Sequence, residues 1–348
     1  MIMCWMQKPA LGGKRMKALK KVLIAVALLA IAVLVPSPAL MEGAFFTLYG
    51  QFIAVTGLFA ILLVNSSRKQ ILRIGRDDAA IDVIRRVDTP TLALCCIPAA
   101  LVGARLLYCL FRFDFYAFEV GVAGVLRIWE GGFLLYGALL GVLAAVAALA
   151  KAKQVPMSLL LDEIAAPCMM AISISRMAEG MTTEGVGMWI EGGFFCRFPF
   201  AVQNEWGEWQ LAMYVFETAV AVAILFYVLH HRAAPGETFL TALLLYAGCQ
   251  IVLESLRMDG CLRIGFVRVS QVLSGAAVFT VTLMRALRVG KKPALISGGL
   301  CLAGIAVAGI IEWALDKTAV SNLILYPVMI AVCVLLIANG MRYEKKKA

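Results

Sequence analysis

Long apolar runs separated by short polar loops are the main pattern of this 348-residue chain. A run of about 20 apolar residues is long enough to cross roughly 30 Å of hydrocarbon as an α-helix. The pattern therefore predicts an all-α, polytopic membrane bundle with about ten transmembrane helices. The predicted segments are 22–40, 45–64, 91–111, 132–150, 158–176, 210–229, 238–256, 268–286, 294–312 and 322–341.

Two of these segments have a second interpretation. Segment 22–40 follows a basic arm and ends in PSPAL, as a signal peptide would, but its apolar stretch is long for one, so we favour an uncleaved anchor. Segment 158–176 contains Asp162, Glu163 and Pro167. Its second interpretation is a broken or re-entrant helix, which is tolerated only where protein or a water-filled cavity shields the backbone.

Composition supports the membrane class and indicates an orientation. Hydrophobic residues make up 62% of the chain and the mean hydropathy is +0.89. The net charge of +10 comes from Lys and Arg in the N-terminal arm, in alternate loops and in the C-terminal tail. The positive-inside rule places both termini in the cytoplasm and loops 112–131, 177–209 and 257–267 outside. The charge therefore indicates topology rather than a nucleic-acid partner.

Cysteine and histidine usage gives no sign of a metal centre. The ten cysteines include no CxxC pair, and the only histidines are His230 and His231. The sequence therefore predicts no metal and no cofactor. Cys196 and Cys261 both fall in predicted outer loops, so a disulfide between them is open, but the sequence gives it no support.

Polar side chains interrupt segment 238–256 in a regular order. Tyr246, Gln250 and Glu254 are four residues apart, and Arg257 follows three residues later. At about 100° per residue these side chains share one arc of the helix. Such a stripe is either a polar seam between helices or the lining of a site. A carboxylate inside a membrane costs at least about 2.5 kcal/mol on insertion scales. Because the stripe contains Glu254, we weigh the lining of a site equally with a polar seam.

Further polar residues fall at the outer ends of neighbouring segments. An interfacial aromatic belt or a snorkelling arginine explains each of them singly. Together they supply cations that suit a lipid phosphate and carboxylates that orient those cations. Glu179 follows Arg176 by three residues, so the two pair if the helix continues. The other outer residues are Tyr49, Arg105, Tyr108, Trp129, Glu130 and Tyr136.

These stretches resemble the bacterial prolipoprotein diacylglyceryl transferases. SRMAEGMTTEGVG, residues 175–187, resembles the family pattern G-R-x-G-N-F-x-N-G-E-x-x-G and keeps Arg176, Glu184 and Gly187 in register. WEGGFLLYGALLG resembles W-x-G-G-x-x-x-H-G-G-x-x-G, and YAGCQIVLESLR resembles Y-G-x-x-R-x-x-x-E-x-x-R. TLYGQFIAVTG, GARLLYCLF and SQVLSG match three further family segments. The resemblance covers about residues 44–287.

The resemblance implies a seven-helix core that corresponds to the second to eighth predicted segments. One helix then precedes the core and two follow it. We expect residues 1–43 to form a basic arm and anchor, residues 44–290 the transferase-like domain, and residues 291–348 two additional helices with a basic tail.

The resemblance also implies an activity in a bacterial plasma membrane. A diacylglyceryl group would pass from phosphatidylglycerol to the lipobox cysteine of a secreted prolipoprotein, within the lipid bilayer and without a metal. Arg176 would bind the phosphate, Glu184 and Glu254 would orient polar groups or handle the proton, and Tyr136 would stand at the family histidine position. Residues expected to contact substrate are Tyr49, Arg105, Glu179, Gly187, Tyr246, Gln250 and Gln271.

Several positions depart from the family pattern. Tyr136 replaces a histidine, Gln250 replaces an arginine and Glu179 replaces an asparagine; no Arg-His-Pro precedes the helix at 210. A membrane homologue that binds lipid or lipoprotein without the reaction is therefore the alternative function. A transporter is a third class, but the polar groups gather in one leaflet rather than at the midplane.

Overall fold

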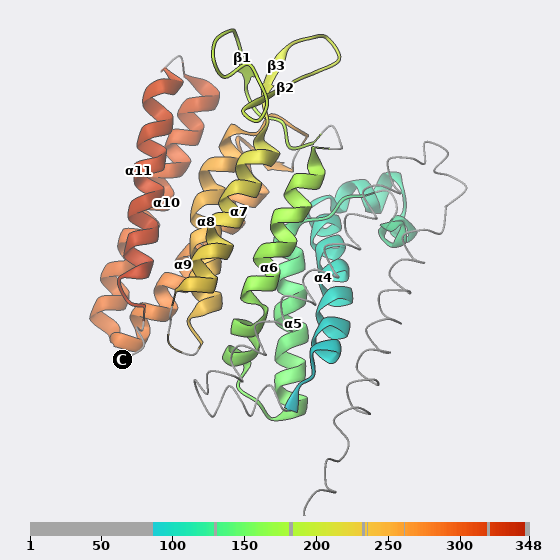
Figure 1. The fold of residues 1–348 in the computed structure, drawn as a ribbon, viewed down its shortest axis with the longest axis vertical. Helices are drawn as coiled ribbons and strands as arrows, with labels where there is room; N and C mark the ends of the chain where they lie inside the picture. Colours follow the sequence, from blue (N-terminus) through green and yellow to red (C-terminus); the bar gives the residue numbers. More distant parts are fainter. Residues whose placement is uncertain are drawn as a thin grey trace, which may run out of the picture.

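The structure is a computed structural model, and it describes residues 86–128, 131–180, 184–231, 234, 236–260, 262–318 and 321–344. The predicted segments 22–40 and 45–64, and with them Tyr49, lie outside the described residues. So do Trp129, Glu130 and Cys261, whereas Cys196 is a free thiol. In the described part, long helices lie side by side and short strands gather at one end of the bundle (Figure 1).

Eight helices of the described part are long and apolar enough to cross a membrane. Each begins within three residues of a predicted segment. The prediction of a polytopic helical membrane protein is therefore confirmed. The helices are α4 (Thr89–Phe111), α5 (Leu135–Lys153), α6 (Met157–Glu179), α7 (Met213–His230), α8 (Thr238–Leu256), α9 (Val269–Val289), α10 (Lys291–Lys317) and α11 (Asn322–Met341).

Segment 158–176 is a membrane-length helix as predicted, and the alternative of a broken or re-entrant segment is wrong. α6 is one continuous helix with Pro167 inside it. Asp162 does not disturb the helix because its carboxylate accepts backbone N–H groups of Gly236 and Phe239, at 2.5 and 3.0 Å. The polar residue thus satisfies the beginning of α8, where backbone donors lack helical partners.

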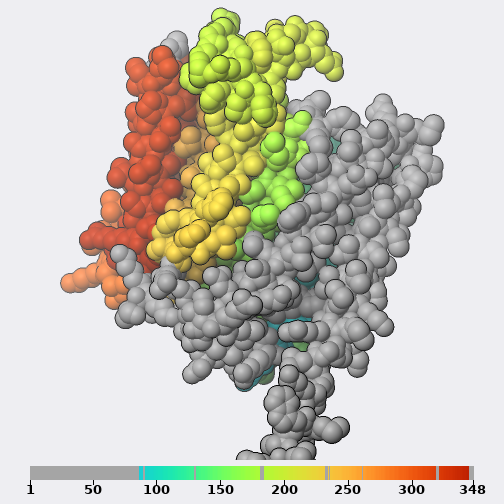
Figure 2. All heavy atoms as spheres, in the orientation of Figure 1, coloured from blue at the N-terminus to red at the C-terminus, as the bar shows by residue number. Residues whose placement is uncertain are grey.

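The end of the bundle that carries all the strands is called the strand end below. β1 (Trp189–Ile190), β3 (Trp209–Leu211) and β2 (Ala201–Gln203) form an antiparallel sheet in that order, and β4 (Arg263–Ile264) pairs with β5 (Val267–Arg268). The β1–β3 segment projects beyond the helices (Figure 2). The short helices η1 (Phe115–Glu119) and η2 (Val122–Leu126) lie between α4 and α5, at the same end.

α8 is the central helix of the described part. Its Ala242 and Tyr246 belong to an apolar core shared with α4, α5, α6 and α7. Its Leu244 and Ala247 belong to a second core shared with α9, α10 and α11. The pair α10–α11 therefore packs against the side of the bundle that α8 and α9 present (Figures 1 and 2). Polar residues on α8 consequently lie between two packed layers.

An ion-pair group fastens the second layer at the end opposite the strands. Arg285 of α9 is fully buried, and its Nε atom lies 2.9 Å from Oε2 of Glu237. Arg288 also pairs with Glu237. Arg285 donates further hydrogen bonds to Thr241 of α8 and to the carbonyl of Gly340 in α11. One buried guanidinium thus joins three helices.

Candidate functional site

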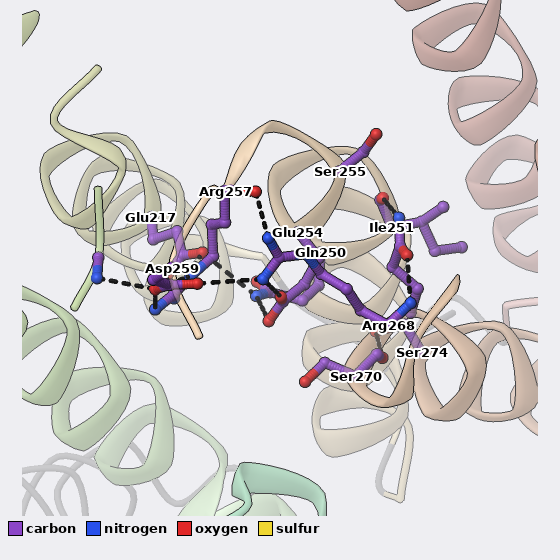
Figure 3. A network of polar contacts seen from close by, with 12 residues as sticks. Glu217, Gln250, Ile251, Glu254, Ser255, Arg257, Asp259, Arg268, Ser270 and Ser274 are labelled. Atoms are coloured by element: carbon purple, nitrogen blue, oxygen red, sulfur yellow. Dashed lines mark hydrogen bonds and ion pairs between the residues drawn. The ribbon is translucent and has the colours of Figure 1, made fainter. Parts of the chain in front are cut away.

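A buried group of charged side chains lies near the strand end, between α6, α7, α8 and α9. Figure 3 shows most of it as one connected network. Ionisable groups at membrane depth are costly unless they pair with one another, so such a group marks a functional site. We call it the ion cluster, and its members are Arg176, Glu179, Glu217, Glu254, Arg257, Asp259 and Arg268.

Glu217 joins the two arginines at the centre of the ion cluster. It lies in the second turn of α7 and is fully buried. Its Oε2 atom forms an ion pair with Nε of Arg176 at 2.9 Å and accepts a hydrogen bond from Nη1 of Arg257 at 3.0 Å. A carboxylate removed from such a position leaves buried charges uncompensated. Glu217 therefore allows two guanidinium groups to stay in the protein interior.

Arg257 connects the end of α8 to α6. Its Nη2 atom lies 3.0 Å from Oε2 of Glu179, and its Nε atom donates to Oδ2 of Asp259 at 2.9 Å. Glu179 also pairs with Arg176 at 2.6 Å. The predicted Arg176–Glu179 pair is confirmed, because α6 continues as a helix through Glu179.

Arg268 closes the ion cluster from the side of α9. Its Nη1 atom lies 3.0 Å from Oδ1 of Asp259 and 3.8 Å from Oε2 of Glu254. Its Nη2 atom donates to the carbonyl oxygen of Arg257. The three guanidinium groups are thus held in place by four carboxylates, which come from α6, from α7 and from the end of α8 with the loop that follows it.

The glycine-rich stretch after α6 is fixed against the end of α8. Gly185 has a φ of +74°, which suits glycine, and its N–H donates to Oδ2 of Asp259 at 2.9 Å. Gly187 donates to the carbonyl of Leu211 at 2.7 Å. A Cβ atom at Gly187 would lie 2.8 Å from the carbonyl oxygen of Leu256, which is too close. Glycine at both positions therefore lets this loop approach the ion cluster.

Two groups of the site lie outside the membrane-spanning helices and have shifted pKa values. Burial raises the pKa of Glu184, and the carboxylates of Glu179 and Asp259 raise it further. Arg257 and Arg176 lower this pKa, but by less. Burial lowers the pKa of Arg257, but Glu217 and Glu179 raise it by more, so it lies above its usual value. Glu184 thus keeps a proton to higher pH than an ordinary glutamate, whereas Arg257 stays charged.

Gln250 lies between two carboxylates of the ion cluster. Its Nε2 atom is 3.1 Å from Oε1 of Glu254 and 3.4 Å from Oε1 of Glu217. Because both neighbours are acceptors, the amide must turn its NH₂ group toward them and its Oε1 atom away. That oxygen is buried and has no hydrogen-bond donor in the described part of the chain.

An apolar cavity of about 250 Å³ lies between α4, α5, α6 and α8. Tyr136 and Tyr246 are polar exceptions in a lining made mainly of aliphatic side chains such as Leu139 and Ile172. The Tyr246 hydroxyl lies 3.5 Å from Nη2 of Arg176, so the cavity and the ion cluster meet there. An apolar volume beside a buried guanidinium suits an amphiphile with an acyl chain and an anionic head.

Tyr136 turns its hydroxyl toward α9. Its oxygen lies 2.5 Å from Oγ of Ser274, and the Ser274 hydroxyl donates to the carbonyl of Ser270 at 2.7 Å. Because Ser274 has one hydroxyl hydrogen and uses it on Ser270, Tyr136 must be the donor in the first bond. Tyr136 therefore has no hydrogen left to donate toward a ligand.

Other predicted site residues use their polar atoms elsewhere. Arg105 is buried, and its guanidinium donates to carbonyl groups of residues 124, 125, 127, 131 and 132, so it shapes the loop between α4 and α5. Gln271 accepts from the backbone N–H of Arg268 and donates to the carbonyl of Ile251. Among the predicted residues, those in or beside the ion cluster are Arg176, Glu179, Glu184, Gly187, Tyr246, Gln250 and Glu254.

Four members of the ion cluster are not among the predicted site residues, and of these Arg257 was placed only on the polar stripe of segment 238–256. Glu217 is the only carboxylate in α7, and a lone ionisable residue inside an apolar helix is itself a signal of function. Asp259 lies in the connection after α8, and Arg268 ends the two-residue strand β5 directly before α9; charged residues are ordinary at such positions. Their sequence gave no signal that would separate them from solvated loop residues.

The fold and the site define a polytopic helical membrane protein with buried guanidinium–carboxylate pairs next to an apolar cavity. Residues 39–287 match the family described as prolipoprotein diacylglyceryl transferase, and this chain belongs to that family.

Curated relatives agree with that membership. A protein of Pediococcus pentosaceus is 29% identical over 239 residues, which cover 65% of this chain and 80% of the relative. A protein of Listeria innocua is 27% identical over 237 residues, covering 65% and 79%. A protein of Lactiplantibacillus plantarum is 28% identical over 206 residues, covering 56% and 72%. All three are named phosphatidylglycerol–prolipoprotein diacylglyceryl transferase.

Proposed function

We propose that this chain transfers a diacylglyceryl group from a glycerophospholipid to the lipobox cysteine thiol of a secreted prolipoprotein. In the relatives named above the lipid is phosphatidylglycerol. The thiol sulfur forms a bond to the terminal glycerol carbon of the diacylglyceryl group, and the bond from that carbon to the phosphate oxygen breaks. Glycerol phosphate leaves, and the thiol proton is passed on to it. The products are a thioether and a free headgroup phosphate.

The position of Arg176 is the observation that carries the proposal. One guanidinium nitrogen of Arg176 faces the Tyr246 hydroxyl at the cavity, while the other two pair with Glu179 and Glu217. A cation held in this way is preorganised for the charge that develops on a leaving phosphate. The adjacent apolar cavity accepts an acyl chain of the same lipid.

Proton handling falls to carboxylates in this proposal. Glu184 and Glu254 stand near the arginines, and burial raises the pKa of Glu184, so its carboxyl group keeps a proton to higher pH than an ordinary glutamate. Tyr136 takes a positioning role, since its hydroxyl hydrogen is used on Ser274. Tyr246 donates its own hydroxyl hydrogen to a phosphate oxygen.

The proposal also assigns a domain and an orientation. We infer that residues 44–290 form the transferase domain, a boundary supported by the family match over 39–287. Residues 1–43 precede it as an arm and anchor, and residues 291–348 add α10, α11 and the tail. The basic loops favour cytoplasmic termini, so the strand end faces outward, where an exported prolipoprotein arrives.

Reconstitution tests the proposed reaction directly. Purified full-length protein in lipid nanodiscs receives phosphatidylglycerol and a lipobox peptide, and mass spectrometry measures the thioether peptide. We expect the wild type to form it and Arg176→Ala to form none above background. An equal yield from both proteins would reject the role of Arg176. No thioether from either protein would reject the transfer reaction and favour lipid binding without catalysis.

The replacements at Tyr136 and Gln250 favour lipid binding without transfer as the second candidate. In that case, the wild type retains phospholipid in native mass spectrometry and forms no thioether. A separate experiment tests the orientation: labelling of cysteines at the strand end in intact cells shows whether that end faces the outside.

A further inference from the structure

The ion cluster carries a net negative charge among the described residues. Its three guanidinium groups face the four carboxylates of Glu179, Glu217, Glu254 and Asp259, so the sum is −1 when all are ionised. Bringing a phosphate monoanion alone into this group adds a like charge where the effective dielectric constant is low. A ligand that also carries a positive group avoids that repulsion.

Most cluster donors already have protein acceptors. Arg257 donates to Glu217 and Asp259 and forms an ion pair with Glu179, and Arg268 donates to Asp259 and a backbone carbonyl. Nη2 of Arg176 has only the long contact to the Tyr246 hydroxyl, as far as the described residues go. The site therefore offers one guanidinium edge and one hydroxyl to a phosphate.

Two acceptor oxygens lack a hydrogen-bond donor next to this edge. Oε1 of Gln250 and Oε2 of Glu254 are buried and accept no hydrogen bond within the described ranges, although Arg268 lies 3.8 Å from the second. The two residues are 1% and 2% exposed and stand one helical turn apart on the same face of α8. Figure 3 shows them side by side within the network. Buried acceptors of this kind are costly unless a donor reaches them.

We propose that Gln250 and Glu254 bind the ammonium group of a zwitterionic headgroup, so that phosphatidylethanolamine serves as a diacylglyceryl donor for this chain. The proposal rests on the proposed transferase function. The ammonium group supplies donors to both oxygens and offsets the excess negative charge, while Arg176 and Tyr246 contact the phosphate. The glycerol hydroxyls of phosphatidylglycerol also donate hydrogen bonds, but they bring no positive charge.

The reaction balances in the same way with either lipid. The cysteine sulfur forms a bond to the terminal glycerol carbon, and the bond from that carbon to the phosphate oxygen breaks. The thiol proton ends on the released phosphoethanolamine, and no oxidant or further reactant is needed. The thioether product is identical, so only the released headgroup distinguishes the two lipids.

The test compares three lipids under one assay. Full-length protein in phosphatidylcholine nanodiscs receives a lipobox peptide with phosphatidylethanolamine, with phosphatidylglycerol or with no added lipid, and mass spectrometry measures the thioether and the headgroup. We expect transfer from phosphatidylethanolamine at least as fast as from phosphatidylglycerol. We expect none from phosphatidylcholine, whose quaternary nitrogen has no N–H to donate. Transfer from phosphatidylglycerol alone would overturn the inference and leave the proposed function intact.

Lipid binding gives a readout that does not need catalysis. Native mass spectrometry of the wild type should retain phosphatidylethanolamine over phosphatidylglycerol, and Gln250→Arg should reverse the order by roughly tenfold, since it adds the cation that balances the cluster. If neither lipid yields a thioether, the transferase function fails and the binding order alone decides the inference. Equal retention of the two lipids by the wild type would overturn it.

Discussion

The Nε atom of Arg176 lies 2.9 Å from the Oε2 atom of Glu217. The two residues are 41 positions apart and come from α6 and α7, and the same carboxylate also holds Arg257. Three segments of the chain therefore depend on one buried side chain for their charge balance. Such a residue stabilises the bundle and sets the orientation of the guanidinium proposed to bind phosphate.

Replacement of Glu217 should destabilise the protein strongly. Glu217→Ala leaves two buried guanidinium groups without their shared carboxylate, and breaking a buried pair in this way costs about 3–5 kcal/mol. We expect a lower thermal unfolding midpoint in detergent and loss of lipid binding. Glu191→Gln is the matched control, because Glu191 is exposed in the loop after β1. An unchanged midpoint for Glu217→Ala would show that the pairs contribute little.

The two cavity tyrosines should respond differently to removal of the hydroxyl. Tyr136→Phe loses the bond to Ser274, worth about 1 kcal/mol of stability, and should leave transfer and lipid binding nearly unchanged. Tyr246→Phe removes the hydroxyl beside Arg176 and should lower transfer by roughly tenfold, as loss of about 1.5 kcal/mol of transition-state binding implies. The reconstituted thioether assay measures both. Equal losses in the two variants would contradict the assignment of Tyr136 to a positioning role.

The membrane spans were predictable from the sequence because hydrocarbon thickness and backbone hydrogen bonding leave few alternatives to long apolar helices. The stripe of Tyr246, Gln250 and Glu254 was predictable for a similar reason, since helical periodicity places them on one face. Both inferences needed only local spacing. They did not depend on how the helices pack.

The remaining residues depend on tertiary contacts that spacing does not encode. Arg105 is of a residue type that commonly binds anionic ligands, but its guanidinium donates hydrogen bonds to carbonyl groups of a nearby loop. Gln271 likewise stabilises the beginning of α9. Asp162 looked disruptive within a membrane segment, and only the position of the α7–α8 connection shows what it binds. Glu217 was missed because its partners lie on other helices.

Stability should depend on pH through Glu184. Burial and the carboxylates of Glu179 and Asp259 raise its pKa by more than Arg257 and Arg176 lower it. The folded state therefore binds this proton more tightly than the unfolded state does. Stability from this group is therefore present at low pH and is lost as pH rises from the usual carboxyl pKa through the raised value. Glu184→Gln mimics the protonated form and should keep this stability as pH rises.

Thermal unfolding of the wild type and Glu184→Gln across this range provides the measurement. The difference between their midpoints should be small at the acidic limit and should grow in favour of the variant as pH increases. The exposed control Glu191→Gln should give a difference that is flat with pH. A flat difference for Glu184→Gln as well would mean that the folded and unfolded states bind its proton equally.

Close packing of α4 on α5 should depend on glycine. A Cβ atom at Gly141 would meet the carbonyl oxygen of Ala99, and one at Gly137 would meet the carbonyl oxygen of Gly103. Backbone atoms cannot move aside as a flexible side chain does, so Gly141→Ala must push the two helices apart and expose the cavity that they line. We expect a lower unfolding midpoint and weaker lipid retention. A Cβ atom at Gly309 in α10 meets no atom of the described residues within 4 Å. Because alanine favours helix by about 1 kcal/mol over glycine, the control Gly309→Ala should keep or raise the midpoint. Equal destabilisation by the two substitutions would show that backbone proximity between α4 and α5 is not what requires glycine.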